Sequence, residues 1–150
     1  MTQKKSINTD CYIFLLAKAS QKGHQLVQKR LEPFEITNIQ YVVLEVLWNQ
    51  EDLTAVDLGK RLMIDKATMS GILDRMVHGG WVIKVPDEQD KRVIRLFASE
   101  KSFALKDRLI KERESANEEL LSGFTAQERA VFKKLLLGLL GERQETTHTP

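Results

Sequence analysis

The sequence predicts a mainly α-helical fold of about six helices with one two-stranded β-hairpin. Along most of the 150-residue chain, apolar residues recur at intervals of three and four, the period of an amphipathic helix. Three of these segments start at a threonine that is followed, three residues later, by glutamine, aspartate or glutamate, a pattern typical of helix N-termini. Residues 81–97 differ, because two short runs rich in β-branched residues flank a charged turn.

Two helices are predicted before residue 50. The first covers residues 8–31, where no proline interrupts an apolar stripe. Pro33 ends it, because proline disfavours helical geometry in the preceding residue and has no backbone N–H to donate. Thr37 and Gln40 form a capping-box pattern, which opens a second helix over residues 37–49.

Two shorter helices follow. Thr54 and Asp57 repeat the capping pattern and open the third helix. The fourth begins near Asp65 and ends at the Gly79-Gly80 pair, since glycine accepts the left-handed conformation that closes many helices. One side of the fourth helix is small, polar and basic, and the other side is apolar and is expected to face the core. The apolar residues are Met69, Ile72, Leu73, Met76 and Val77.

A hairpin and two more helices complete the chain. The strands are predicted at residues 81–85 and 92–97, joined by a charged turn. A charged helical pattern then runs from residue 99 to about residue 121. Thr125 and Glu128 open the last helix, which carries a broad apolar stripe. The stripe contains Val131, Phe132, Leu135, Leu136, Leu139 and Leu140.

Charge and composition exclude several classes of protein. The net charge is +2, but residues 60–95 hold eight basic and five acidic side chains, so the positive excess lies in the middle of the chain. The apolar runs are far shorter than the ~20 residues of a membrane-spanning helix. We find no signal peptide pattern and expect a cytoplasmic protein. Motifs for phosphate loops, nucleophiles and metal ligands are missing, so we expect no enzyme, metal or cofactor.

The order of helices and hairpin is that of a winged helix-turn-helix, which suits duplex DNA. A major groove ~12 Å wide accepts one α-helix whose small residues allow close approach, while basic and hydroxyl groups meet bases and phosphates. At the hairpin tip, Lys91 and Arg92 are expected to reach the minor groove, with Asp90 placed to orient Arg92. On the fourth helix the candidate DNA-binding residues are Lys66, Ala67, Thr68, Ser70, Gly71 and Arg75.

Four segments, in this order, resemble the multiple antibiotic resistance regulator (MarR) family. They are ITNIQYVVL at 36–44, LGKRLMIDKATMS at 58–70, LDRM with GWV between 73 and 82, and PDEQDKR at 86–92. Their order and spacing are specific although no single motif is, and the resemblance extends over about residues 10–140. It implies a bacterial or archaeal homodimeric transcription regulator that binds a pseudopalindromic operator near a promoter.

The resemblance also implies regulation and assigns site residues. Members of the family often repress until a small phenolic or lipophilic ligand, or oxidation, lowers their affinity for DNA. The resemblance places the recognition helix at residues 66–77 and the wing tip at residues 90–92. Lys84 stands where the family usually has arginine before the wing turn, and a lysine cannot make a bidentate contact, so the strength of the wing contacts is open. Ser102 stands at a position that is usually glycine.

The chain is expected to form one unit, residues 1–150, because no interior linker rich in proline, glycine or serine divides it. Residues 36–98 are the predicted winged helix-turn-helix lobe, and residues 7–32 and 99–142 the predicted dimerisation helices. The apolar content of these helices is large for a lone small domain, so we expect a symmetric dimer to bury it. An intramolecular core is the alternative.

Three features of the sequence each allow two interpretations. Cys11 is either a redox sensor, with Lys18 on the same helix face to favour the thiolate, or an inert apolar residue of the dimer core. Tyr41 and Trp48 either line a ligand cavity between the lobes or belong to the core. The winged helix is either a DNA-binding module or a protein-interaction module. A protein-interaction module would expose an apolar patch on the fourth helix, where the sequence instead has small and basic residues.

Overall fold

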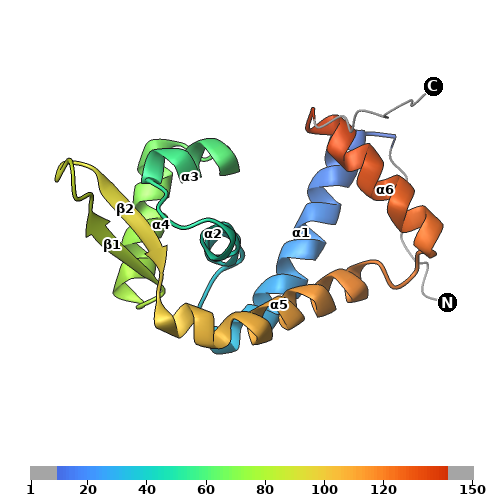
Figure 1. Cartoon of the computed structure of the whole chain (residues 1–150). Helices are drawn as coiled ribbons and strands as arrows, with labels where there is room; N and C mark the ends of the chain where they lie inside the picture. The colour runs from blue at the N-terminus through green and yellow to red at the C-terminus, as the bar shows by residue number, and fades with distance from the viewer. Residues whose placement is uncertain (1–9, 142–150) are drawn as a thin grey trace, which may run out of the picture.

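Six α-helices and one β-hairpin form residues 10–141, the part of the chain that the computed structural model describes (Figure 1). The helices are α1 (Tyr12–Leu31), α2 (Asn38–Asn49), α3 (Ala55–Leu62), α4 (Lys66–His78), α5 (Glu100–Leu120) and α6 (Ala126–Leu139), with a 3₁₀ turn η1 (Glu32–Phe34) after α1. The strands are β1 (Val82–Pro86) and β2 (Ile94–Ala98). The predicted fold class, mainly helical with a small wing, is confirmed.

Side-chain caps hold the predicted helix starts in place. At Thr37, Thr54 and Thr125 the threonine hydroxyl accepts a hydrogen bond from the backbone N–H three residues later. The side chain of that later residue accepts a bond from the threonine N–H in return, so both halves of the capping box form. At the end of α4, Gly80 has φ +74°, which glycine adopts without strain and which turns the chain toward β1.

Helix α1 is shorter than the sequence predicts. It begins at Tyr12, because Cys11 is extended, with φ −79° and ψ 102°, and takes the N-cap position. The predicted start, Asn8, lies outside the described residues. No side-chain hydrogen bond caps this end of the helix. At the other end, Pro33 in η1 stops the helix as predicted.

The wing is a two-stranded antiparallel sheet. β1 begins one residue later than predicted and β2 two residues later, at Ile94. The turn is longer because it includes Val93, whose N–H donates to the carbonyl oxygen of Asp90 at 2.9 Å. The edge of β2 is joined to the α2–α3 connection, since the N–H of Leu96 donates to the carbonyl oxygen of Leu53 at 2.8 Å.

One apolar core joins α2, α3, α4 and the wing to parts of α1 and α5. The predicted lobe, residues 36–98, therefore does not close its core alone. Val77 was predicted on the core side of α4 but is 38% exposed, because it lies roughly 80° around the helix from Met69, at the edge of the buried stripe. The apolar residues with an exposed fraction of 1% or less are Leu31, Ile36, Tyr41, Val43, Leu44, Leu47, Leu58, Met69, Leu73, Met76, Leu96, Leu109 and Ala116.

Helix α6 and the start of α1 bury little within one protomer. No residue of α6 is buried, and Tyr12 at the start of α1 is 80% exposed. Figure 1 shows these segments at the opposite end of the molecule from the wing. Residues 7–9 and residue 142 of the predicted dimerisation segments lie outside the described residues. Among residues 10–141, no helix is both long enough and apolar enough to span a membrane.

Candidate nucleic-acid interface

Helix α4 presents small, polar and basic side chains to solvent. Met69, Leu73 and Met76 on its other side are at most 1% exposed, which fixes the orientation of the helix. The predicted DNA-binding residues Lys66, Ala67, Thr68, Ser70 and Arg75 are exposed, and Gly71 is half-buried. The structure therefore brings all six together on the solvent side of one helix.

The N-cap of α4 restricts what Thr68 offers to a ligand. Asp65 accepts two hydrogen bonds from Thr68, one from its backbone N–H at 2.9 Å and one from its hydroxyl at 2.6 Å. These bonds, the hydroxyl bond first, hold the pKa of the Asp65 carboxyl below its usual range. Because the hydroxyl proton is already donated, Thr68 can offer a base only its oxygen lone pairs and its methyl group.

Gly71 lies between these side chains with space around it. A Cβ atom added at Gly71 would have one neighbour within 4 Å, the Nη2 atom of Arg75 at 3.9 Å. That distance is ordinary van der Waals contact, and the neighbour is the end of a flexible side chain. Packing within the described protomer therefore does not require a glycine at this position.

The wing tip holds one arginine in a defined orientation. The Nε of Arg92 lies 3.0 Å from Oδ1 of Asp90 and its Nη2 lies 3.1 Å from Oδ2, a bidentate pair. The Arg92 hydrogen bond is the largest cause that lowers the pKa of Asp90. The Arg92 side chain is 90% exposed, and its neighbour Lys91 is exposed too. The predicted orientation of Arg92 by Asp90 is therefore confirmed.

Lys84 takes part in a different contact. Its Nζ lies 2.7 Å from Oδ1 of Asp74 on α4, so the side chain joins the wing to that helix. A contact between Lys84 and DNA would have to compete with this ion pair.

Two residues that sequence reasoning missed, Asp87 and Arg95, organise the wing turn. The Oδ1 atom of Asp87 accepts bonds from the N–H groups of Gln89 at 2.9 Å and Asp90 at 3.0 Å. Its Oδ2 atom accepts a bond from Nε of Arg95 at 3.0 Å. Together these bonds, the one from the Asp90 N–H first, lower the pKa of Asp87. The one signal in the sequence was the Pro86-Asp87 pair, which is typical of a turn.

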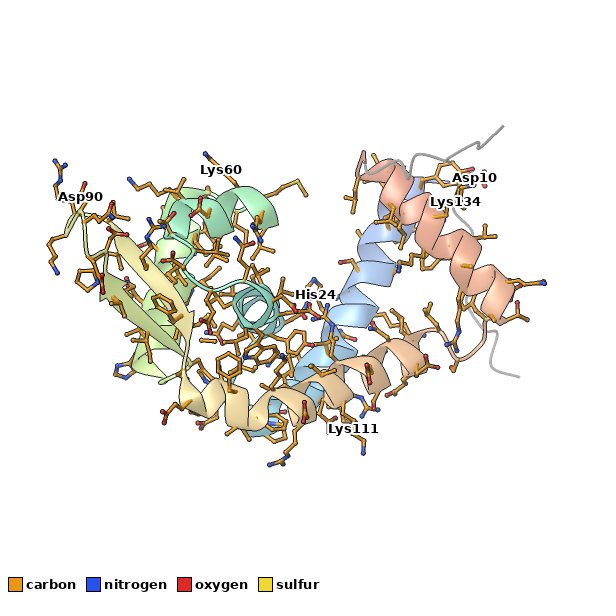
Figure 2. The ribbon with its side chains drawn as sticks, viewed as in Figure 1. Asp10, His24, Lys60, Asp90, Lys111 and Lys134 are labelled. Atoms are coloured by element: carbon orange, nitrogen blue, oxygen red, sulfur yellow. The ribbon has the colours of Figure 1, made fainter. Side chains whose placement is uncertain are left out.

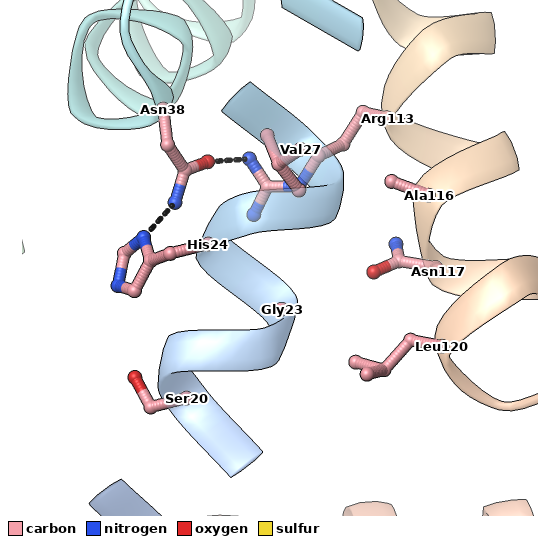
Figure 3. Close-up of a pocket in the computed structure, with 9 residues that line it drawn as sticks. All are labelled: Ser20, Gly23, His24, Val27, Asn38, Arg113, Ala116, Asn117 and Leu120. Carbon is pink, nitrogen blue, oxygen red and sulfur yellow. Dashed lines mark hydrogen bonds between the residues drawn. The ribbon is translucent and has the colours of Figure 1, made fainter. Parts of the chain in front are cut away.

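A cavity of about 190 Å³ lies where α1, α2 and α5 meet (Figure 3). Arg113 donates from Nη1 to Oδ1 of Asn38 at 2.7 Å, and Nδ2 of Asn38 lies 3.3 Å from Nδ1 of His24. Since the oxygen of Asn38 faces Arg113, its NH₂ group faces the ring of His24. The lining also includes the apolar side chains of Val27, Ala116 and Leu120 and the polar side chains of Ser20 and Asn117.

Of the two interpretations of Tyr41 and Trp48, the structure supports the second, because both belong to the core. They are 1% and 8% exposed, and their rings pack edge to face with centroids 6.0 Å apart. The Nε1 of Trp48 donates to the hydroxyl of Ser102 at 3.2 Å, so the serine found at the usual glycine position satisfies the buried indole. The aromatic pair is therefore part of the packed interior.

Cys11 is exposed at the N-cap of α1. The amine of Lys18 donates to Oε1 of Gln21 at 3.4 Å and lies over the ring of Phe14. Between residues 10 and 141 no group of three His, Cys, Asp or Glu side chains has the arrangement to hold a metal ion. A redox role for Cys11 stays a prediction.

This geometry is shared with known regulators. The model of the MarR family matches residues 36–94, from the chain just before α2 to the start of β2. The multiple antibiotic resistance protein MarR of Escherichia coli (strain K12) is 30% identical over 127 residues, which cover 84% of this chain and 88% of that protein. The chain belongs to the MarR family.

Two other relatives extend the comparison. A crystal structure of a mutant MarR from E. coli complexed with operator DNA superposes on this MarR-family chain with a TM-score of 0.79. The two are 30% identical, and the match covers 85% of this chain and 91% of the other. The HTH-type transcriptional regulator TtmR of Methylorubrum extorquens (strain PA1) is 36% identical over 96 residues, which are 64% of this chain and about half, 49%, of TtmR.

Proposed function

We propose that this MarR-family regulator binds a pseudopalindromic operator in duplex DNA as a homodimer and represses a nearby promoter until a small effector binds. One observation carries the proposal. An uncovered small, polar and basic face on α4 occurs together with an exposed guanidinium, that of Arg92, which Asp90 holds at the wing tip. Figure 2 shows Asp90 at the end of the wing, away from α1 and α5.

In the proposed complex, α4 lies in a major groove and the wing tip in the adjacent minor groove. Thr68 accepts a hydrogen bond from the amino group of an adenine or a cytosine, and Ser70 contacts the next base edge. Gly71 lets the helix approach the bases closely. Lys66, at the helix N-terminus, binds a phosphate, where the backbone N–H groups also favour an anion. Arg92 enters the minor groove, whose negative potential attracts a guanidinium.

The surface of α4 favours DNA over a protein partner. A protein-interaction module needs an apolar patch on this helix, but the exposed side chains are mostly polar or basic. Val77 is apolar and 38% exposed, yet it lies in the last turn of the helix, beside His78. The wing tip carries exposed Lys91 and Arg92, which suit a polyanion.

A homodimer explains the apolar surface at the other end of the protomer. In α6, Leu135 and Leu139 are 62% and 70% exposed, and Ile13 in α1 is 80% exposed. Large exposed apolar patches mark interaction sites in soluble proteins. A second copy related by twofold symmetry would cover this patch and place two α4 helices on one face of DNA, as a pseudopalindrome requires.

We place the effector in the cavity among α1, α2 and α5. Arg113 offers N–H donors to a carboxylate or a phenolate, and Val27 and Leu120 offer apolar contact. At about 190 Å³ the cavity suits a small phenolic or lipophilic molecule. A ligand that separates Asn38 from Arg113 would move α2, and with it the wing lobe, relative to α5.

Further parts of the proposal concern chemistry and location. We infer that the chain acts by binding alone and catalyses no reaction, since relatives such as TtmR are named as transcriptional regulators. Its proposed DNA target places it in the cytoplasm.

Oxidation of Cys11 is the alternative to an effector. If it acts, peroxide weakens DNA binding by the wild-type protein and leaves the Cys11→Ser variant unaffected; equal responses would exclude it.

A selection experiment tests the proposed function. The wild-type protein is incubated with a random-sequence pool of DNA duplexes, and bound duplexes are recovered and sequenced. We expect a pseudopalindromic consensus whose affinity falls steeply with salt, because phosphate contacts release counterions. Recovery of no consensus, with binding equally weak to every duplex, would contradict a sequence-specific regulator.

A further inference from the structure

Arg95 connects the wing to the α2–α3 connection. Its Nε donates to Oδ2 of Asp87 at 3.0 Å and lies 3.4 Å from Oδ1 of Asp52. Its Nη1 donates to the carbonyl oxygen of Asp52 at 3.2 Å. Since Arg95 is in β2 and Asp52 follows α2, the guanidinium joins two parts of the lobe that are far apart in sequence.

The α2–α3 connection is a fixed point for this contact. Asp52 has φ +69°, a left-handed conformation that aspartate tolerates better than most residues. The next residue, Leu53, is 5% exposed and accepts the 2.8 Å hydrogen bond from the N–H of Leu96. The carbonyl group that Arg95 binds is therefore held next to the core.

From Arg95 the contacts continue to the wing tip. Asp87 bonds Arg95 with one carboxylate oxygen and the N–H groups of Gln89 and Asp90 with the other. Asp90 in turn holds the guanidinium of Arg92 in a bidentate pair. One continuous set of hydrogen bonds therefore runs from the core to the residue proposed to enter the minor groove.

We propose that Arg95 is a positioning residue of the wing, which acts through Asp87 to set where Arg92 meets DNA and does not itself contact DNA. The proposal rests on the proposed DNA-binding function. Arg95 differs from Arg92 in two ways that support it. Its side chain is 31% exposed against 90% for Arg92, and its bonds cross between elements, whereas Arg92 bonds only within its own turn. Lys84, which pairs with Asp74, attaches the base of the wing to α4 independently.

A double-mutant cycle tests the proposal. The affinity for a duplex selected by the wild-type protein is measured for Arg95→Gln, Arg92→Ala and the double variant. We expect Arg95→Gln to weaken binding about tenfold in the parent and to have no further effect when Arg92 is alanine. The slope of log affinity against log salt concentration should become shallower by about one in each single variant. The double variant should show the same change of about one, and not the sum of two changes. Additive losses, or an undiminished affinity of Arg95→Gln, would overturn the proposal.

Arg30→Gln is the matched control. Arg30 is 32% exposed and bridges Glu112 and Glu119 across α1 and α5, so the variant loses the same charge far from the wing. Its effect, if any, should be independent of Arg92. Because exposed ion pairs contribute little to stability, both glutamine variants should keep the melting temperature within a few degrees of the parent.

Hydrogen exchange of the free protein tests whether Arg95 holds the wing, independently of whether the protein binds DNA. The amides of Gln89 and Asp90 should exchange faster in Arg95→Gln and be unchanged in Arg30→Gln, because only the former loses the partner that holds Asp87. Unchanged exchange in Arg95→Gln would refute the positioning role. If the wild-type protein selected no DNA, the proposed function would fail, while exchange would still report whether Arg95 holds the wing.

Discussion

The wing lobe and the terminal helices differ in how completely one protomer buries their apolar side chains. In the lobe, Leu44, Leu47 and Leu58 are fully buried. In α6, Leu135 and Leu139 are 62% and 70% exposed, although that helix has the same capping box and the same apolar periodicity. The local sequence signals are therefore equal, and the difference lies in whether a second layer covers the apolar stripe.

This difference shows which part of the molecule buries its apolar side chains within one chain. Burying a leucine side chain contributes about 1.5–3 kcal/mol, so a helix that leaves several exposed forfeits much of its stabilisation. The lobe gains this energy within the protomer, with help from Leu31 of α1 and Leu109 of α5. The terminal helices gain it only when another surface packs on them, which is the proposed role of a second copy.

The largest expected effect is on stability, and it comes from replacing one leucine by alanine in the lobe or in α6. Leu47→Ala should lower the free energy of unfolding by about 3 kcal/mol, because it opens a cavity in a closed core. Leu135→Ala should destabilise the protein only in a manner that depends on protein concentration, because its partner is another chain. Urea unfolding at two protein concentrations measures both. If both variants lost the same free energy of unfolding at both protein concentrations, the apolar stripe of α6 would not be covered by a second chain.

Charge at the exposed stripe should separate the subunits without unfolding the lobe. The Leu135→Lys, Leu139→Lys double variant should sediment as a monomer and bind the selected operator about 100-fold more weakly, since the second half-site no longer adds avidity. The near-ultraviolet circular dichroism spectrum should be unchanged, because Trp48 and Trp81 lie in the core of the lobe. A double variant that still forms dimers would place the subunit contact elsewhere.

Gly71→Ala tests whether the open face of α4 meets DNA. The added methyl group has room in the free protein, so the variant should be more stable by about 0.5–1 kcal/mol, the helix-propensity gain of alanine over glycine. It should nevertheless bind the selected operator about tenfold more weakly, because the methyl group occupies space next to the bases. Thermal unfolding and a fluorescence titration measure the two changes. Greater stability with unaltered binding would mean that α4 does not approach DNA closely.

The smallest expected effect is a loss of stability in acid, concentrated in the lobe. Hydrogen bonds lower the pKa of Asp57, Asp65, Asp87 and Asp90, all in the lobe, and of Glu128 in α6. A carboxyl group whose pKa is lower in the folded state stabilises that state above its unfolded pKa of about 4, and the contribution is lost as the pH falls through the folded pKa.

The urea midpoint should therefore decrease as the pH is lowered below about 4, and the decrease should be smaller in an Asp65→Asn variant. Measuring both proteins at matched ionic strength tests this contribution. A midpoint that rises on acidification, or an identical decrease in the variant, would contradict it.

Local sequence signals predicted the elements of the fold well. The three threonine caps and the helical apolar periods identified all six helices and the wing, because these signals depend on neighbours within four residues. Two details were predicted wrongly, because residues 10 and 11 are not helical and Val77 is exposed. The exposure of Val77 depends on what packs against α4, which a one-dimensional pattern does not contain.

The candidate site was predictable where its residues lie close together in the sequence. The small and basic face of α4 and the Asp90–Arg92 pair follow from residues close in sequence. The bond from Arg95 to Asp52 joins positions 43 residues apart, and the bond from Arg113 to Asn38 joins positions 75 apart. Contacts over such distances arise from the tertiary fold, so neither the wing attachment nor the cavity could be read from spacing.

The mass of the complex with DNA shows most directly whether the protein binds its operator as a dimer. Sedimentation equilibrium of the wild-type protein with a selected operator duplex measures how many protomers bind. We expect two protomers per duplex, with half-site centres about one helical turn apart, because the terminal helices join two lobes. One protomer bound tightly and specifically to each duplex would contradict it, since the exposed apolar end would then play no part in recognition.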